Sequence, residues 1–209
     1  MTTLLLRLVG PLQSWGLSSR FGERDTGSEP SKSGVLGLLA AALGRDRKAD
    51  ISDLCALRMG VRCDRPGMLI RDYHTALDVL SADGKKRDTV LSNRYYLSGA
   101  AFWVGFEGEG DVVAACHAAL RVPKWPLFLG RKACPPSVPL YDPQGLVELP
   151  LLVALAHCRF LGDGDSQVAL RAVIDDANGR LQRPDQPLGP FSQRRFGNRA
   201  VREEFLTCT

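Results

Sequence analysis

The residue types best suited to chemistry gather between Gly10 and Gly44. The turn GPLQSWG opens this stretch with polar side chains, and Lys32, Ser33 and Gly34 begin an apolar segment further on. Free backbone N–H groups at a helix start attract an anion, while lysine adds charge and glycine gives close access. The stretch therefore predicts an anion site for a phosphate group. The alternative is an ordinary capped core helix with one solvated lysine.

A nucleotide-hydrolysing P-loop is excluded at this place. That motif requires glycine immediately before its Lys-Ser pair, and this chain has Ser31 there. Ser31 and Ser33 are instead candidates to cap the first turn of the helix, and Gly44 is placed to end it.

A catalytic alternative centres on His74 in the sequence RDYHT. Metal-free RNA cleavage requires a base for the 2′-hydroxyl and a cation for the phosphorane, and Tyr73, His74 and Lys85 have those chemical types. No partner acid or base for His74 is recognisable from spacing. The favoured interpretation is that Tyr73 and His74 lie at a strand end, where they orient a hairpin or stack on a base.

The remaining composition predicts no metal, no cofactor and no membrane contact. Six cysteines lack any CxxC pair or framework spacing, which argues against a structural zinc site and favours reduced cytosolic cysteines. The N-terminal apolar run is short, is broken by Arg7 and lacks the basic region of a signal peptide. No apolar run approaches a membrane span. We therefore expect a cytoplasmic protein.

Charged residues are segregated along the chain, whose formal net charge is +4. Residues 121–141 contain four cations and no acid, and residues 180–202 contain six arginines against Asp185 alone. Such segregation indicates a basic face for a polyanion. The alternative is scattered, solvated arginine.

A basic hairpin and several aromatic residues support the polyanion interpretation. Lys85, Lys86 and Arg87 directly follow Asp83-Gly84, a pair that favours a hairpin turn. We expect the tip to grip a phosphate backbone, and the alternative is a surface hairpin kept soluble by lysine. Aromatic side chains near basic residues can also stack on unpaired bases. The aromatic candidates are Trp15, Tyr73, Tyr95, Tyr96, Trp125, Phe191 and Phe196. Among them, Trp15, Tyr73 and Phe196 are favoured as residues that stack on bases.

Hydrophobic periodicity predicts the elements that must position these residues. The predicted strands are residues 3–10, 59–65 with 68–74 as its antiparallel partner, the hairpin around 83–84, 100–106, 167–175 and 201–206. The predicted helices are residues 35–43, 51–57, 111–120 and 146–160. Residues 121–145 and 180–199 are predicted to be irregular. The alternation of strands and helices indicates an α+β sandwich of the ferredoxin-like kind.

Five motifs in sequence order carry a resemblance to a known family. They are LRLVGPLQSWG at 6–16, PSKSGVLGLLAAALG at 30–44, RDYHT at 71–75, LGRKACP at 129–135 and, more loosely, RRFGNR at 194–199. With these motifs the chain resembles the CasD family, the RNA-end-capping subunits of type I-E CRISPR Cascade complexes within the RAMP superfamily. The resemblance covers nearly the whole chain.

The resemblance implies a fold and a function. The implied fold is one domain over residues 1–209, ferredoxin-like (RRM-type), with a protruding thumb hairpin at 76–98 and an irregular basic C-terminal segment at 180–199. Members of the family bind the 5′ handle of CRISPR RNA in antiviral defence, and the thumb kinks the RNA where the handle meets the spacer. The implied partners are CRISPR RNA, the Cascade backbone subunit, the large subunit and, through the complex, target DNA.

The resemblance also bears on catalysis and on the residues that contact RNA. Type I-E complexes use a separate endonuclease, so this chain is expected to be non-catalytic. Type I-C relatives cut CRISPR RNA themselves; for a metal-independent endoribonuclease of that kind the candidates are Tyr73, His74 and Lys85. The RNA-binding residues implied by position are Gln13, Ser14, Trp15, Arg24, Lys32, Ser33, Arg71, Tyr73, His74, Lys85, Lys86, Arg87, Gly130, Arg131, Lys132, Arg194, Arg195 and Arg199.

Overall fold

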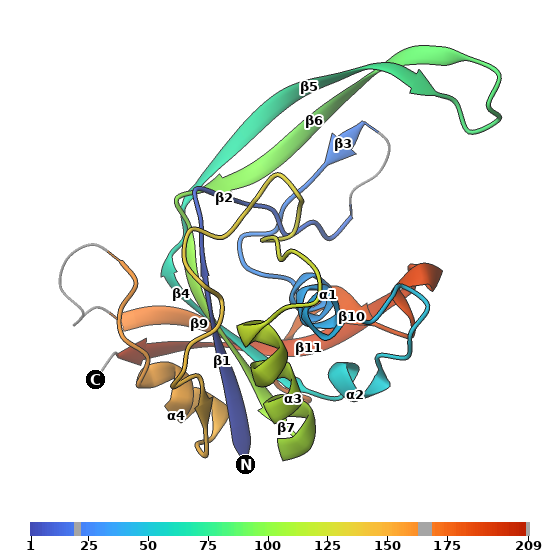
Figure 1. Cartoon of the computed structure of the whole chain (residues 1–209). Coiled ribbons are helices and arrows are strands. Elements are labelled where there is room, and N and C mark those ends of the chain that lie inside the picture. Colours follow the sequence, from blue (N-terminus) through green and yellow to red (C-terminus); the bar gives the residue numbers. More distant parts are fainter. Residues whose placement is uncertain (19–21, 163–168, 208–209) are drawn as a thin grey trace.

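The computed structural model of the chain describes residues 1–18, 22–162 and 169–207, which form a mixed α+β structure. Within those residues, the strands lie in two mostly antiparallel sheets (Figure 1). The larger sheet has the order β10-β11-β9-β4-β7-β1-β8, and the smaller has the order β2-β6-β3 with β5 also paired to β6.

The strands of the larger sheet are β1 (Thr2–Val9), β4 (Arg58–Arg65), β7 (Ala101–Gly108), β8 (Leu146–Val147), β9 (Ala169–Asp175), β10 (Leu181–Pro187) and β11 (Phe196–Thr207). The strands of the smaller sheet are β2 (Leu12–Gln13), β3 (Glu23–Arg24), β5 (Met68–Leu80) and β6 (Arg87–Ser98). The helices are α1 (Lys32–Leu43), α2 (Ser52–Cys55), α3 (Gly110–Arg121), α4 (Leu151–Ala156) and the 3-10 turn η1 (Phe191–Gln193).

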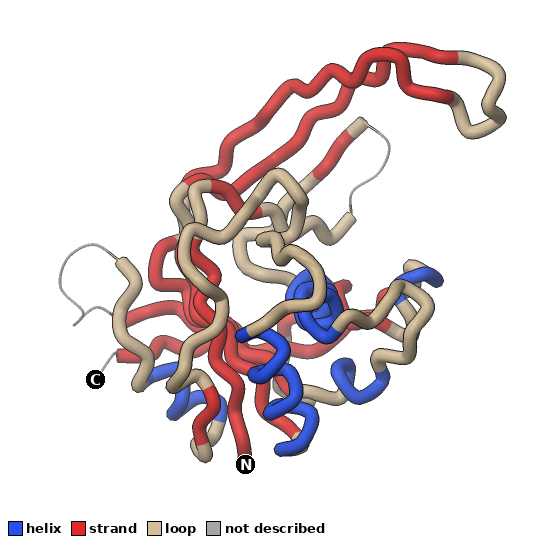
Figure 2. Tube along the Cα trace, in the orientation of Figure 1, coloured by secondary structure: helices blue, strands red, loops and turns tan. Residues whose placement is uncertain are grey.

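The larger sheet separates two hydrophobic layers, with α1 and α3 on one face and α4 on the other (Figure 2). Successive side chains of a strand point to opposite faces. Leu4, Leu6 and Leu8 of β1 are therefore buried with α1 and α3, whereas Leu5 packs with Leu151 of α4. Because both faces of β1 are covered, its sequence is an almost unbroken apolar run. The strand predicted at residues 3–10 is confirmed.

The helix α1 lies in the core of the first layer. Val35 and Leu39 are fully buried, as the apolar run predicted. Gly44 ends the helix with φ 73°, which confirms the predicted C-cap. Ser31 occupies the N-cap position but makes no capping hydrogen bond through its side chain. The backbone N–H of Lys32 donates instead to a carboxylate of β10.

The hairpin of β5 and β6 projects from the body of the molecule, and we call residues 68–98 the thumb (Figure 1). Pairing begins with Met68 opposite Ser98, so the thumb starts before the predicted residue 76. Residues 68–74 pair with β6 and not with β4, because β7 and β9 already occupy both edges of β4. A turn at Pro66-Gly67, with Gly67 at φ 73°, redirects the chain between β4 and β5.

The outer part of the thumb contains a bulge. The register shifts between Ala76 and Val79, and Asp78 adopts φ 57° between them. Arg87 Nη1 lies 2.5 Å from Asp78 Oδ2 across the hairpin. One of the three cations predicted for the thumb tip is therefore paired with a carboxylate.

The C-terminal segment is more regular than predicted. β10 and β11 form an antiparallel pair with Leu181 opposite Val201, so the prediction of an irregular segment at 180–199 is wrong. Its proline content suggested irregular structure, but Pro184 and Pro187 lie in the edge strand β10, where a missing N–H is tolerated. The turn η1 connects the two strands.

Two other predicted boundaries also change. Residues 146–160 are not one helix: β8 comes first, and α4 begins only after Pro150, which cannot continue a preceding helix. The loop at 122–145 is irregular, as predicted. The predicted strand at 167–175 corresponds to β9, and its first two residues, Gln167 and Val168, lie outside the described residues.

Candidate nucleic-acid interface

The start of α1 already holds an anion, and that anion belongs to the protein itself. The backbone N–H of Lys32 donates to Asp185 Oδ2 at 2.7 Å, and Lys32 Nζ lies 3.0 Å from Asp175 Oδ2. The Lys32 side chain is only 5% exposed. The attraction of the helix start for negative charge is thus satisfied internally. The ammonium group of Lys32, which the sequence predicted to bind an RNA phosphate, is thus paired with a carboxylate of the protein in this structure.

Arg199 joins the same two carboxylates. Its Nε and Nη2 donate to Asp185 at 2.6 and 3.0 Å, and its Nη1 donates to Asp175. Burial alone would lower the pKa of Arg199, but the hydrogen bond to Asp185 and the charges of both carboxylates outweigh it and raise that pKa. Since its guanidinium is buried in these pairs, Arg199 is not available as the predicted RNA contact.

The turn GPLQSWG also lies inside the protein. Gln13 Nε2 donates to two backbone carbonyls at 2.9 Å, and Gln13 Oε1 accepts from Trp15 Nε1 at 3.0 Å. Ser14 Oγ donates to the carbonyl of Tyr95 in β6 at 3.0 Å. Gln13, Ser14 and Trp15 are at most 3% exposed. These side chains fasten the base of the thumb to the body, and their prediction as RNA ligands stays a prediction.

Arg131 fastens the loop at 122–145, which we call the proline-rich loop, to the smaller sheet. Its Nη2 donates to the carbonyls of Arg24 and Asp25 at 2.7 and 3.0 Å, and its guanidinium carbon lies 5.0 Å from the ring centre of Tyr96. Gly130 has φ 90°, and a Cβ there would lie 1.8 Å from a backbone oxygen of the GPLQSWG turn. Arg131 therefore has a structural role, and Gly130 is required by close packing.

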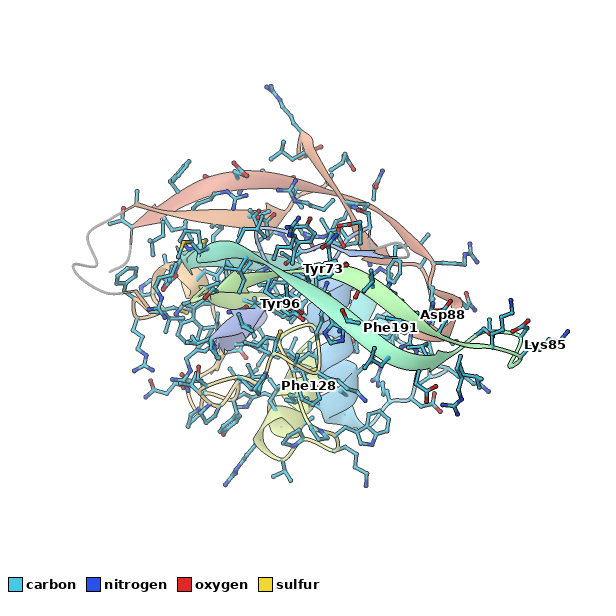
Figure 3. The ribbon with its side chains drawn as sticks, turned by 90° about the horizontal axis from the view of Figure 1, so that it is seen from above. Tyr73, Lys85, Asp88, Tyr96, Phe128 and Phe191 are labelled. Carbon is cyan, nitrogen blue, oxygen red and sulfur yellow. The ribbon has the colours of Figure 1, made fainter. Side chains whose placement is uncertain are left out.

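The structure does not bring Tyr73, His74 and Lys85 together. Tyr73 and His74 are neighbours in β5, so their side chains point to opposite faces of the thumb. Nδ1 of His74 lies 3.7 Å from Oδ2 of Asp72, on the face opposite Tyr73 and Arg71. Lys85 lies at the far tip of the thumb (Figure 3). The arrangement required of an endoribonuclease centre is therefore absent for these three residues.

Several predicted cations are exposed, and their side chains make no hydrogen bond or ion pair with another residue that the structure describes. We call this set the exposed cations: Arg24, Arg71, Lys85, Lys86, Lys132, Arg194 and Arg195. They come from β3, the thumb, the proline-rich loop and the turn between β10 and β11. Among the favoured aromatic residues, Tyr73 is 62% and Phe196 is 46% exposed, whereas Trp15 is buried.

A hollow on the outer side of α1 was not predicted from the sequence. It encloses about 590 Å³ and is lined by small residues of α1 and by aromatic side chains of two separate loops. Trp125 and Phe128 come from the proline-rich loop, and Phe191 comes from η1. Ser33, a predicted RNA-binding residue, lies at its edge. Small residues at helical spacing were the available signal, but no local pattern indicates which aromatic residues cover them.

Residues 1–18, 22–162 and 169–207 contain no cluster of three or more His, Cys, Asp or Glu side chains arranged to hold a metal ion. No helix in those ranges is long and apolar enough to cross a membrane. Burial raises the pKa of the Cys63 and Cys116 thiols to about 11, which makes them poor nucleophiles.

Comparisons with known proteins all identify CRISPR-associated proteins as similar to this chain. Residues 3–202 match the profile of the CRISPR-associated protein family Cas5. The CRISPR system Cascade subunit CasD of Escherichia coli strain K12 is 37% identical over 165 residues, 68% of this chain and 73% of that protein. A crystal structure of a Cas protein is 51% identical, with a TM-score of 0.83, and covers 99% of this chain and 95% of its own. A chain of a CRISPR RNA-guided surveillance complex is 32% identical, with a TM-score of 0.80 over 98% of this chain and 90% of its own.

Proposed function

This chain belongs to the Cas5 family of CRISPR-associated proteins, and on that premise we propose that it binds the 5′ handle of CRISPR RNA in a surveillance complex. In this role it caps one end of the assembly in antiviral defence. The observation that carries the proposal is the thumb, a hairpin that projects from the body (Figure 1). It exposes cations together with aromatic and apolar side chains. Cations of this kind hold phosphates, and aromatic faces hold unpaired bases.

The proposed RNA surface consists of the exposed cations together with Tyr73 and Phe196. Lys32, Arg199 and Arg131 are not part of it, because ion pairs and backbone carbonyls already occupy their charged groups. Leu80 is 55% exposed near the thumb tip, where an apolar side chain can separate neighbouring bases. Phosphate contacts therefore come from surface residues, and the buried ion pairs hold the elements that carry them.

The core of the proposed RNA-binding domain is ferredoxin-like. In chain order it runs β1, α1, β4, β7, α3 and β8, and these four strands are neighbours in the order β4-β7-β1-β8. Each neighbouring pair among them is antiparallel. This succession supports the βαββαβ motif. The thumb is then an insertion between the second and third core strands of a single domain spanning residues 1–209.

The subunit is proposed to be non-catalytic. The separation of Tyr73 and His74 onto opposite faces of β5 supports this, because cleavage requires a base and a cation at one phosphate. The proposed partners are the backbone subunit and the large subunit of a Cascade complex in the cytoplasm, with target DNA reached through the complex. Repeat RNA incubated with the chain in chelator for hours is expected to stay intact. A product with a 2′,3′-cyclic phosphate end would establish the endoribonuclease alternative.

Handle recognition is tested by comparing two RNAs of equal length on the full chain. Fluorescence anisotropy should give tighter binding to an RNA with the repeat-derived 5′ handle than to one with the handle scrambled. Lys85→Ala combined with Lys86→Ala should weaken binding and reduce the salt slope by about 1.4, at about 0.7 for each phosphate contact of a single strand. Equal binding of both RNAs at moderate salt would refute handle recognition.

A further inference from the structure

The larger sheet has a hollow on the face opposite α1, and we call this hollow the α4 pocket. It encloses about 360 Å³ between α4 and the segment 142–149. Its floor consists of Leu5 of β1 and Trp103 of β7, which are 7% and 4% exposed. Trp103 is opposite Arg7 in the register, so it lies on the same sheet face as Leu5. The volume is near the lower end for ligand pockets, about 300–1,000 Å³, and suits a single ring system.

Two glycines let α4 approach the sheet closely. Gly60 of β4 and Gly105 of β7 are opposite one another in the register. A Cβ on Gly105 would lie 2.5 Å from Cδ1 of Leu151, and one on Gly60 would lie 2.9 Å from Cδ1 of Leu155. Both leucines belong to α4 and are fully buried. The helix is therefore seated directly on the sheet backbone, which fixes one wall of the α4 pocket.

A buried ion pair holds the C-terminal end of that wall. The guanidinium of Arg62 is fully buried and donates to the carboxylate of Asp64 at 2.8 and 2.9 Å. It also donates to the carbonyls of Cys158 and Arg159 at 2.9 and 3.0 Å, and Nε1 of Trp103 donates to the same carbonyl of Arg159 at 2.9 Å. The wall is thus formed before any ligand arrives, which lowers the entropic cost of binding.

The segment on the other side of the pocket is also held in place. The N–H of Leu5 donates to the carbonyl of Gly145 at 2.7 Å, and the N–H of Gly145 donates to the carbonyl of Asp142 at 2.9 Å. The carboxylate of Asp142 accepts the N–H of Gln144 at 3.0 Å and lies 3.5 Å from Nε of Arg7. The acidic group in the lining of the pocket therefore already has partners of opposite polarity.

Two exposed side chains of the lining offer polar groups to a ligand. Nδ1 of His157 lies 2.8 Å from the carbonyl of Val153. Because a carbonyl only accepts, Nδ1 carries the proton, and Nε2 of the neutral ring is left as a hydrogen-bond acceptor. The side chain of Arg159 makes no hydrogen bond or ion pair with another residue that the structure describes. The pocket therefore combines an apolar floor with one acceptor and one cation.

We propose that the α4 pocket receives an aromatic side chain with a hydrogen-bond donor, tryptophan or tyrosine, from a neighbouring protein of the complex. The inference rests on the proposed function and names where a protein partner docks. The ring lies against Leu5 and Trp103, its N–H or O–H donates to Nε2 of His157, and the guanidinium of Arg159 covers the ring face. An aromatic anchor in a preformed pocket is a common centre of a protein interface.

The position of the pocket favours a protein occupant over RNA. The thumb and α4 lie at opposite ends of the molecule in the view of Figure 1. None of the exposed cations is among the described residues that line the pocket, and Arg159 is the one arginine or lysine in that lining. A nucleic-acid strand requires a series of phosphate contacts, which a single cation does not supply. The pocket is therefore accessible while RNA occupies the proposed RNA surface.

The test uses two exposed positions, each with a matched control. His157→Leu removes the acceptor and keeps an apolar side chain, whereas His157→Gln keeps an acceptor in its amide oxygen. Arg159→Glu reverses the charge, whereas Arg159→Lys keeps it. Both side chains are exposed, so all four variants should fold, and thermal melts followed by circular dichroism verify this.

The first measurement titrates N-acetyltryptophanamide into the full chain and follows the indole N–H signal of Trp103 by NMR. The signal should shift saturably. His157→Leu should bind this probe about threefold or more weakly than His157→Gln, as expected for one lost hydrogen bond. Arg159→Glu should bind it about twofold or more weakly than Arg159→Lys, because the cation over the ring is removed. N-acetylphenylalaninamide, which has no donor on its ring, should bind the parent about threefold more weakly.

The second measurement follows assembly. The chain is co-expressed with the neighbouring subunits and CRISPR RNA, the complex is purified through another subunit, and native mass spectrometry gives the share of complexes that contain the chain. His157→Leu combined with Arg159→Glu should lower this share about tenfold, since anchor residues dominate an interface. His157→Gln combined with Arg159→Lys should assemble like the parent. The isolated double variants should bind handle RNA like the parent in fluorescence anisotropy.

Each contrary result has a distinct meaning. Equal binding of N-acetyltryptophanamide by His157→Leu and His157→Gln, or no binding by the parent, would refute the aromatic occupant. Probe binding with normal assembly of the double variant would show that the pocket takes a free aromatic molecule, and the partner would be wrong. Loss of handle RNA by the folded double variant would place the pocket in the RNA surface and overturn the inference. A parent without preference for the handle would refute the proposed function and leave the probe result unchanged.

Discussion

Replacing Lys32 with methionine separates a structural role from an RNA-binding role. The Nζ of Lys32 is paired with Asp175 at 3.0 Å, and the side chain is 5% exposed. Methionine keeps most of the apolar stem and removes the charge. We expect the variant to lose stability and to keep its salt-dependent RNA contacts, because a buried ammonium group cannot release counterions from a phosphate.

The size of the stability loss follows from the partners that remain. Removing one member of a buried ion pair costs about 3–5 kcal/mol, chiefly because the other charge is left unpaired. Asp175 is not left unpaired, since it keeps Arg199 and accepts the N–H of Met59 at 2.9 Å. The expected loss is therefore near the lower limit, about 3 kcal/mol. For a chain of this size that lowers the thermal midpoint by about 6–12 °C.

The assay compares Lys32→Met with Lys132→Ala, which changes an exposed lysine in the loop at 122–145. Urea titrations followed by circular dichroism give the free energies of unfolding. Anisotropy at several salt concentrations, at a temperature where every variant is folded, gives the slopes. Lys132→Ala should change stability by at most about 0.5 kcal/mol and reduce the slope by about 0.7. A Lys32→Met protein as stable as the parent, with a reduced slope, would refute the reasoning.

Three further predictions concern side chains outside the RNA surface. Burial alone would raise the pKa of Glu29, but a hydrogen bond from Ser28 and the charges of Arg171 and Arg183 outweigh it and lower that pKa. The ionised carboxylate of Glu29 therefore stabilises the fold fully above the ordinary glutamate pKa, and this stabilisation is lost as the pH falls through the lowered pKa. Glu29→Gln should be about 1–3 kcal/mol less stable than the parent at pH 7. Denaturant titrations should show that this difference disappears in acid. Arg131→Met should speed amide hydrogen exchange about tenfold in residues 22–27, where Arg131 binds backbone carbonyls, and an unchanged rate would contradict its fastening role. Burial raises the pKa of Cys63 to about 11 from an ordinary 9.0, so iodoacetamide at pH 8 should alkylate it about 100-fold more slowly than free cysteine, with mass spectrometry as the measurement.

Local patterns in the sequence were sufficient for the main elements. The alternation of β1, the apolar run of α1 and the glycine at its C-cap depend on neighbouring residues only, and each is confirmed. The hairpin turn at Asp83-Gly84 follows in the same way from residues that tolerate positive φ, and Gly84 has φ 72°. The motifs also indicated the family correctly, because several of them occur in one order.

Local sequence patterns did not determine which strands pair with each other. Residues 68–74 alternate in a way that suits any antiparallel neighbour, and the choice of β6 over β4 depends on which edges other strands occupy. The prolines of β10 suggested an irregular segment. They are compatible with a strand because β10 lies at the edge of the sheet, where a missing N–H donor is tolerated.

The sequence alone determined that a helix start rich in serine and lysine would attract an anion. Only the tertiary structure decided which anion, because the carboxylate of Asp185 comes from 153 residues away and reaches Lys32 through the pairing of β10 with β11. The same pairing buries Arg199 and leaves other cations exposed. Burial and charge pairing depend on contacts between distant segments, whereas helix and strand patterns depend on neighbours along the chain.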